Sequence, residues 1–518
     1  MTKVIIVGSG PSGFSSAYVL LKKGIEVLML DYGNKKNSQN TDPYQTNFNR
    51  NELLSAKDFK WKDQKSDNDI VAGKDDFKKQ YFYNNSELVI DSTVNSIVNI
   101  SLAYGGLSNL WGGAVLPVHD DDITEWPISN KDLKKYYKIV SEFMNILGEE
   151  DNLSKVFKPS YLKKYNFSLG KQMNCFYQEI LNNEKKFNNN GIFFGRAKLA
   201  INPDIPLIKE FPYGPIFNSA LEIDKVLSHP NFEYQSNIFV ENFQESKSKI
   251  IINGTNKLNS KKLTYEADKL LIGCGTISST LLLARSLNLK DSVFEAKTNS
   301  NAFFPFLRLK RTKGISKDKE NNIAQLFLEI KNKNTNNTFV HLQVYEYGDY
   351  VLEPIRRIIR KFTPFFVFFS RFILERIVIM QGMLHSDLSD TLQLKVVKYK
   401  KNWKIKIVAN LNPVVRKKYL SLIKIINNNF SKGIAFKLGM FIDPPGAGNH
   451  IGGTFPMKKY PNPEKNESDT MGRVLGLNNV HIIDASILPS LPAPTITYTI
   501  MANAARIADQ MVVLNEQE

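Results

Sequence analysis

The sequence predicts an α/β protein, and three observations support that prediction. Residues 3–7 form a short, continuous apolar run that is followed by a glycine-rich turn and a helical segment. The same order of strand, turn and helix returns at residues 268–286. Residues 300–350 alternate apolar and polar side chains, which is typical of antiparallel strands. We therefore expect a parallel-sheet domain beside a second domain built on an antiparallel sheet with helices.

The remaining elements follow in chain order. Residues 25–31 are a second strand directly after the first helix, whereas residues 36–87 are polar and turn-rich and predict a lid or surface excursion. A helix is expected over 127–148, with Ser129 or Asn130 as its N-cap. Further elements are a hairpin over 391–408, a strand over 480–487 and a helix over 496–514.

Composition limits the class of protein. The chain has 518 residues, of which 42% are hydrophobic, so it can bury a large core and is neither fibrous nor disordered. At roughly 150 residues per domain, this length suggests about three domains or lobes. Cys175 and Cys274 are the only cysteines, which excludes a disulfide scaffold and any multi-cysteine zinc or iron–sulfur site. Scarce cysteine suits a reducing cytosol.

The formal net charge is +17, from 68 basic and 51 acidic residues. This charge fits either a lysine-rich soluble surface or attraction to an anionic membrane or substrate. We expect no nucleic-acid partner, because no basic motif with interleaved aromatics is present. Signal-peptide features and long apolar runs are lacking as well. The expected location is cytoplasmic, with peripheral attachment to the inner face of the membrane as an alternative.

Three glycines at the start of the chain indicate a dinucleotide site. Gly8, Gly10 and Gly13 form the motif G-x-G-x-x-G between a strand and a helix. In such a motif Gly8 would allow a tight turn and Gly10 would let a pyrophosphate approach the backbone. Gly13 would let the helix pack closely on the strand. The helix N-terminus then faces the phosphates. Asp31 ends the next strand, as expected for a ribose ligand, and disfavours a 2′-phosphate. The motif alone does not separate FAD from NAD.

Four further segments, in order and with suitable spacing, resemble the glucose–methanol–choline (GMC) oxidoreductases, FAD enzymes that oxidise alcohols. They are GGLSNLWGGA (105–114), DKLLIGCGTISSTLLLARS (268–286, with Cys274 where the family usually has Ala), HIGGTFPM (450–457) and NNVHIIDASILPS with the helix after it. The resemblance covers roughly 150 to 180 residues when the N-terminus is included. It implies a Rossmann-like FAD-binding domain of the GMC type.

The resemblance also implies a division of the chain. We expect residues 1–35, 88–149, 226–295 and 441–518 to form a discontinuous FAD-binding domain, and residues 150–225 and 296–440 to form the substrate domain. Besides the N-terminal motif, the cofactor-binding residues that the resemblance implies are Gly105, Gly106, Asn109, Trp111, Gly112, Gly275, Asp484 and Ala485. For Asn109 and Trp111 loop packing is the alternative to flanking the flavin, and for Asp484 the alternative is a strand-end cap.

The chemistry that the resemblance implies is hydride transfer from an alcohol to flavin N5. His450 matches the family's catalytic histidine and would act as the base. The family often has His or Asn before its last helix, where this chain has Thr495, which would serve only as an auxiliary hydrogen-bond donor. The helix that begins near Ile496 would stabilise negative charge on the reduced flavin. Leu110 stands where covalent members carry His, so we expect non-covalent FAD.

Residues 355–380 combine basic and aromatic side chains. Four basic residues precede Pro364, six phenylalanines lie within residues 362–372, and Arg371 and Glu375 would share one face of a helix. This pattern predicts either a membrane-surface segment or a helix buried in the substrate domain or a dimer interface.

The functional expectation is FAD-dependent oxidation of a CH–OH group of a sugar, glycoside or lipid-linked alcohol, with an unknown electron acceptor and no metal. Two alternatives stay open: a GMC-like flavoprotein with lyase or isomerase chemistry, and a membrane-associated flavin-binding scaffold.

Overall fold

The fold was described from a computed structural model of the chain. The structure describes residues 3–34, 88–92, 96–109, 111–158, 162–165, 168–202, 216–315, 323–345, 375–399, 402–430, 434–459, 464, 466–474 and 476–515. The expected excursion over 36–87, Leu110 and most of the 355–380 stretch lie outside these residues.

A five-stranded parallel sheet joins segments from distant parts of the chain. Its order is β22 (Val480–Ile482), β11 (Lys269–Ile272), β1 (Lys3–Val7), β2 (Glu26–Leu30) and β7 (Phe232–Gln235). The central strand β1 is almost wholly apolar and is buried on both faces, as parallel strands covered by helices are. The strand, turn and helix predicted at the N-terminus and again at residues 268–286 are therefore confirmed.

Helices cover this sheet: α1 (Pro11–Lys22), α5 (Asn130–Met144), α8 (Ser219–Val226), α9 (Thr276–Ser286) and α13 (Thr497–Asn515). Helices α1 and α13 lie close together, since the Ser15 and Ser16 hydroxyls donate to the carbonyl oxygens of Met501 and Ala504. Ser129 caps α5, as predicted, through a capping box with Asp132. We call this sheet and its helices the parallel-sheet lobe.

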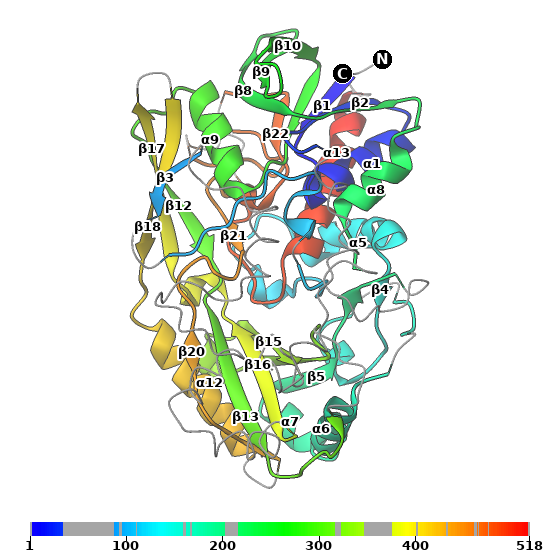
Figure 1. Cartoon of the computed structure of the whole chain (residues 1–518), viewed down its shortest axis with the longest axis vertical. Coiled ribbons are helices and arrows are strands. Elements are labelled where there is room, and N and C mark those ends of the chain that lie inside the picture. The colour runs from blue at the N-terminus through cyan, green and yellow to red at the C-terminus, as the bar shows by residue number, and fades with distance from the viewer. Residues whose placement is uncertain are drawn as a thin grey trace, which may run out of the picture.

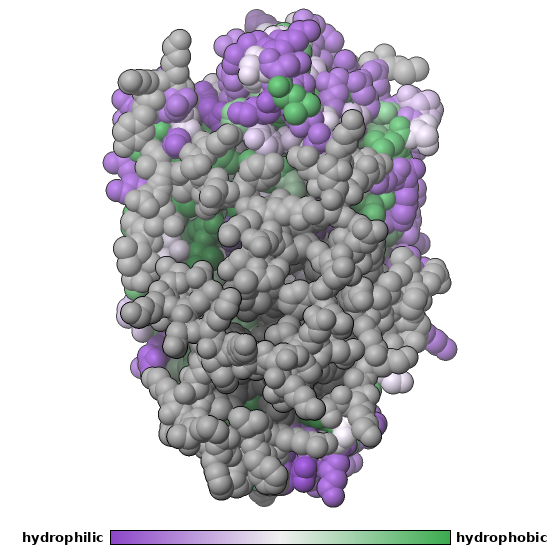
Figure 2. All heavy atoms as spheres, in the orientation of Figure 1, coloured by the Kyte–Doolittle hydropathy of each residue, from purple (hydrophilic) through white to green (hydrophobic). Residues whose placement is uncertain are grey.

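A three-stranded antiparallel sheet extends the parallel-sheet lobe. It consists of β8 (Ile238–Glu245), β9 (Ile250–Asn256) and β10 (Lys262–Ala267). It lies at the end of the molecule where both termini are found, and the described residues around it are mostly hydrophilic on the face that is shown (Figure 1, Figure 2).

The opposite end of the molecule is an antiparallel sheet, which we call the antiparallel-sheet lobe (Figure 1). Its order is β19 (Ala435–Lys437), β13 (Asn301–Arg308), β16 (Ile377–Met383), β15 (Phe339–Tyr345), β14 (Leu326–Lys331) and β5 (Ile192–Arg196), while β20 (Phe441–Ile442) also pairs with β13. One sheet face packs against α6 (Lys171–Leu181), α7 (Glu184–Asn189) and α12 (Val415–Phe430). The antiparallel strands predicted over 300–350 are confirmed.

The apolar face of this sheet is set by strict alternation. Leu326, Leu328 and Ile330 of β14 and Val340 and Leu342 of β15 belong to the same core as α12. The residues between them must then point to the other face, where Phe327 and Phe339 join a separate apolar core that includes Leu153 and Phe157. This alternation decides which side chains lie on the face away from α12.

A mixed sheet connects the two lobes. Its order is β21 (Ile451–Gly452), β12 (Val293–Thr298), β17 (Thr391–Tyr399), β18 (Asn402–Asn410) and β3 (Val89–Ser92). Strands β17 and β18 form the predicted hairpin. Their apolar side chains join the core of the parallel-sheet lobe, although the sequence placed them within the substrate domain. A two-stranded sheet, β4 (Ile146–Leu147) with β6 (Leu199–Ala200), completes the connection.

The prediction for residues 355–380 is wrong at its C-terminal end. Ile377–Met383 is strand β16 in the middle of the antiparallel sheet, so residues 377–380 do not belong to a helix, whether at a membrane surface or buried. Glu375 is buried and pairs with Arg311. Among the helices that the structure describes, none combines the length and the apolar character that crossing a membrane requires.

Tyr419 offers a test of how α12 is anchored. Its buried hydroxyl donates to the carbonyl oxygens of Ser300, 2.6 Å away, and Gly382, 3.1 Å away. We expect Tyr419→Phe to lower the free energy of unfolding by about 1–3 kcal/mol, because two buried acceptors lose their donor. Urea denaturation measures this change. An unchanged midpoint would show that the hydroxyl does not anchor the helix.

Candidate active site

Two glycine turns meet at the N-terminal end of α1. Gly8 has a φ of +104°, and a Cβ at Gly13 would lie 2.0 Å from the Gly8 carbonyl oxygen, so helix and turn are in direct contact. Gly106 of the second turn has a φ of +60°, and its Cβ would lie 3.3 Å from Cα of Gly10. The Gly105 amide donates to the Ser9 hydroxyl at 2.9 Å. The structure thus brings the first two glycine motifs together.

The surface of these turns is open where a phosphate is expected. Ideal Cβ atoms at Gly10, Gly112 and Gly275 would meet no described atom within 4 Å. Gly10 is the N-cap of α1, and the first turn of that helix contains no acidic residue. Amide groups and the positive end of the helix dipole therefore face a cradle that a side chain would fill. This arrangement fits the diphosphate of a dinucleotide.

Asp31 lies at the carboxyl end of β2, as the sequence predicted. Its carboxylate accepts the amides of Ser9, at 2.6 Å, and Gly33. Burial raises the pKa of Asp31 to about 6, partly offset by these hydrogen bonds. Each carboxylate oxygen retains a second lone pair, which leaves an acceptor for a ribose hydroxyl.

Asn109 and Trp111 have protein partners. The Asn109 amide donates to the carbonyl oxygens of Tyr104 and Gly106 and accepts from Asn218 at 2.8 Å. The Trp111 indole donates to the Phe217 carbonyl oxygen at 2.7 Å. Their polar groups hold the loop in shape, which is the packing role that the sequence left open beside direct contact with the flavin.

Asp484 holds a second junction. Its carboxylate accepts the Gly275 amide at 2.9 Å, the Ser279 hydroxyl, and both the amide and the hydroxyl of Ser486. It thereby caps the turn that begins at Ala485 and fixes that turn against the turn before α9. These bonds correspond to the strand-end cap, the alternative to a direct cofactor contact.

The orientation of His450 is set by Asn299, a residue that the sequence did not single out. Asn299 Oδ1 lies 3.1 Å from His450 Nδ1. The Asn299 amide nitrogen donates to the carbonyl oxygens of Leu384, Leu491 and Pro492, so the amide cannot be reversed without losing three bonds. Oδ1 therefore accepts, and Nδ1 of His450 carries the proton. Nε2 is then the basic nitrogen.

Burial keeps His450 neutral. Desolvation lowers the pKa of His450 to about 4, and an electrostatic interaction with His341 contributes in the same direction. Nε2 has no hydrogen-bond partner among the described residues. The imidazole therefore presents a free lone pair at neutral pH, as a general base requires.

Thr495 is buried, and its hydroxyl donates to the Ala114 carbonyl oxygen. The auxiliary role predicted for it would require this bond to break. In the structure the bond joins the start of α13 to the loop that contains Gly112. Helix α13 begins at Thr497, close to the predicted start.

The antiparallel sheet has polar side chains on the face away from α12. Glu329, His341 and Gln343 alternate with the apolar residues of β14 and β15 and are buried. The Tyr345 hydroxyl donates to Gln343 and Gln381 at 2.6 and 3.0 Å. A polar wall of this kind suits a substrate with hydroxyl groups.

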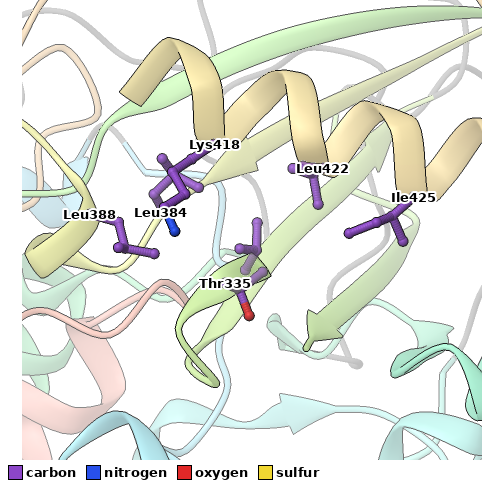
Figure 3. A pocket seen from close by; sticks show the side chains of 7 residues that line it. Thr335, Leu384, Leu388, Lys418, Leu422 and Ile425 are labelled. Carbon is purple, nitrogen blue, oxygen red and sulfur yellow. The ribbon is translucent and has the colours of Figure 1, made fainter. Parts of the chain in front are cut away.

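A small pocket lies elsewhere, between α12 and the antiparallel sheet (Figure 3). Its volume is about 10 Å³, room for one water molecule at most. It is lined by Thr335, Val340, Leu384, Leu388, Lys418, Leu422 and Ile425. Neither its size nor its mostly apolar lining suits a substrate.

Gly10 and Gly13 form a matched pair for testing the cradle. Gly10→Ala adds a Cβ in open space at an ordinary backbone conformation, so we expect unchanged unfolding but at least about tenfold weaker FAD binding, or 1.4 kcal/mol. Gly13→Ala forces the Gly8 carbonyl away and should cost about 3 kcal/mol of stability. Flavin fluorescence titration and urea denaturation separate the two effects. Full FAD affinity in Gly10→Ala would contradict the cradle.

Comparisons with known proteins agree with this site. Residues 444–504 match the family model described as GMC oxidoreductase, and residues 1–41 match the model of an FAD binding domain. No curated protein sequence matches the chain significantly.

Solved structures with the same fold span the whole chain. Pyridoxine 4-oxidase from Mesorbium loti is 12% identical with a TM-score of 0.59 and 99% of each chain covered. An FAD-dependent oxidoreductase from Chaetomium thermophilum is 13% identical with a TM-score of 0.60 and 100% of each chain covered. An R554K variant of formate oxidase from Aspergillus oryzae RIB40 is 13% identical with a TM-score of 0.61, covering 100% of this chain and 99% of that one.

At these identities the structural likeness establishes the fold, while the two family models add the sequence signatures of the cofactor site and of the segment that contains His450. The chain therefore combines the fold of FAD-dependent oxidoreductases with the sequence signatures of an FAD binding domain and of the C-terminal part of the GMC oxidoreductases.

Proposed function

We propose that the protein oxidises the CH–OH group of a hydroxyl-rich alcohol to a carbonyl, with His450 as the base. The observation that carries this proposal is the Asn299–His450 pair, which leaves a neutral imidazole with an unprotonated Nε2. A base of this kind is needed because the alcohol must lose its hydroxyl proton as hydride leaves carbon.

In this proposal, different residues bind the cofactor and accept the proton. The amides around Gly10 and Gly106 and the N-terminus of α1 hold the diphosphate of FAD, and Asp31 accepts a ribose hydroxyl. Bound FAD would supply the hydride acceptor. His450 Nε2 takes the hydroxyl proton, and Asn299 keeps the ring in the required tautomer while the proton moves.

The substrate class follows from the face of the antiparallel sheet that points away from α12. Glu329, His341 and Gln343 are buried polar residues on that face of the sheet, and a hydrocarbon chain would leave Glu329 Oε2 and His341 Nε2 without hydrogen-bond partners. A sugar, a glycoside or a polar lipid-linked alcohol supplies hydroxyls for them. Lyase or isomerase chemistry is less well supported, because His450 is arranged for removal of a hydroxyl proton.

We also propose association with an anionic membrane, which rests on the basic residues before Pro364 and the phenylalanines of residues 362–372. The electron acceptor is likewise a question for experiment. Oxygen and artificial acceptors should be compared once a substrate is found.

The pH dependence of flavin reduction tests the base. Because the pKa of His450 is lowered to about 4, the base is already unprotonated at pH 5. We expect the rate of anaerobic flavin reduction by an alcohol to rise with pH through about 4 and then to stay level up to pH 8. An acid limb near the ordinary histidine value of about 6.5 would contradict the assigned environment.

Substitution of His450 gives the second measurement. His450→Gln should lower the rate of flavin reduction by about 10²–10⁴-fold while FAD remains bound. The screen should include monosaccharides, glycosides, polyols and pyridoxine. His229→Gln, on the surface loop before β7, is the matched control and should react as the wild type does. Equal rates in wild type and His450→Gln would refute the base.

The mode of FAD attachment is tested separately. We propose non-covalent FAD, because Leu110 stands where covalent members carry a histidine. Acid precipitation of the purified protein should leave the yellow chromophore in the supernatant. Flavin absorbance that stays with the precipitate would show a covalent link.

A further inference from the structure

Glu329 and His341 form a buried pair that the proposed mechanism does not yet use. They lie directly opposite each other on β14 and β15, and Glu329 Oε1 is hydrogen-bonded to His341 Nδ1. Their side chains are 0% and 1% exposed. Glu329 Oε2 and His341 Nε2 have no hydrogen-bond partner among the described residues. The pair thus has two buried polar atoms that could form hydrogen bonds with a ligand.

The pair lies close to His450. His341 is opposite Met383 across β15 and β16, and the carbonyl oxygen of the next residue, Leu384, accepts from Asn299. Asn299 in turn holds His450. Alternation on β15 directs His341 away from the apolar core around α12, to the face of the sheet where its ring contacts Phe327. The electrostatic effect of His341 on His450 agrees with this proximity.

The protonation of the pair follows from its surroundings. Burial raises the pKa of Glu329 well above its usual value and lowers the pKa of His341 to about 3. The acidic group that faces Glu329, Asp122, has its own pKa raised to about 7, mainly by burial and partly by Glu329. A neutral pair is therefore favoured, in which the Glu329 carboxyl donates to Nδ1. His341 Nε2 then carries a hydrogen and is a donor.

Among the described residues, two unpartnered atoms on adjoining side chains distinguish this pair from the buried His481, which has one. Each unpartnered buried polar atom costs about 1–3 kcal/mol, and an apolar pair in the same strands would avoid that cost. Active sites commonly retain such unsatisfied groups for a ligand. The position before α13 offers no alternative donor, because the Thr495 hydroxyl already donates to Ala114.

Building on the proposed alcohol oxidation, we propose that His341 Nε2–H donates a hydrogen bond to the oxygen of the reacting CH–OH group, with Glu329 as the positioning residue that holds the ring. The hydroxyl proton passes to His450 Nε2, and the carbonyl oxygen that forms remains hydrogen-bonded to His341. Bound FAD would accept the hydride that leaves the same carbon. His341, on the antiparallel-sheet lobe, thereby supplies the second hydrogen bond to the substrate oxygen that Thr495 does not provide.

Four variants of the holoenzyme test the proposal by stopped-flow reduction of the flavin under nitrogen. His341→Phe removes the donor and should lower the limiting rate by about 10²-fold, whereas His341→Gln keeps an N–H group and should lose about tenfold or less. Glu329→Leu should behave as His341→Phe does, and Glu329→Gln, whose amide can still bond Nδ1, should restore most of the rate.

His481→Gln is the matched control for loss of a buried histidine. His481 lies on β22 in the parallel-sheet lobe, is buried, bonds the Met471 carbonyl oxygen and likewise has no described partner at Nε2. This variant should lose stability without a change in the limiting rate. If His341→Phe reduces its flavin as fast as wild type, the proposal is overturned although the alcohol oxidation stands.

A second readout separates failure of the pair from failure of the proposed function. With six histidines in the chain, ¹⁵N-histidine labelling resolves each ring. We expect His341 to stay neutral with hydrogen on Nε2 from pH 5 to 9, and its Nε2 signal to move when trifluoroethanol, an alcohol that resists oxidation, is added. If no alcohol in the screen reduces the wild-type flavin, alcohol oxidation fails. An Nδ1–H tautomer, or an Nε2 signal unmoved by trifluoroethanol, overturns the donor role of His341 in either case.

Discussion

The parallel pairing of β1 with β11 and of β11 with β22 is the constraint on which the rest of the structure depends. It places Val4 beside Lys269, and Leu270 beside Val480, so three segments separated by more than 200 residues end at one edge of a sheet. Each strand is followed there by a turn that contributes to the site: the turn at Gly8, the turn at Gly275 and the turn capped by Asp484. Ligands of parallel sheets bind at the carboxyl ends of the strands for this reason. The cofactor cradle is a consequence of strand order.

Local signals in the sequence were enough to predict much of this lobe. The G-x-G-x-x-G turn lies between the strand and helix that it predicts, and Ser129 caps α5 because a serine with an acid three residues later satisfies two amides. Helix α12 was not predicted, although Val415, Tyr419, Leu422, Ile423 and Ile426 repeat at helical spacing and are buried. The strand Ile377–Met383 was taken for a helix end, since a fully buried apolar run has no clear period.

The site was harder to predict than the fold, because its geometry depends on contacts across the chain. A motif singles out His450, but Asn299, which fixes its tautomer, lies 151 residues away and belongs to no motif. Glu329 and His341 meet only through the register of β14 and β15. Motifs also single out Asn109, Trp111 and Asp484, but the partners of these side chains in the structure are protein groups, which a motif cannot distinguish from cofactor contacts.

The contact between α1 and α13 has a consequence for the biosynthesis of the protein. Hydroxyls of Ser15 and Ser16 in the first helix bond backbone carbonyls of Met501 and Ala504, and β22 adds residues 480–482 to the edge of the parallel sheet. A nascent chain that has not yet released residues 480–515 from the ribosome therefore has a complete glycine turn but no closed flavin site. Cofactor capture must follow translation of nearly the whole chain, and until then the apolar faces of β1 and α1 depend on chaperones or transient contacts for protection.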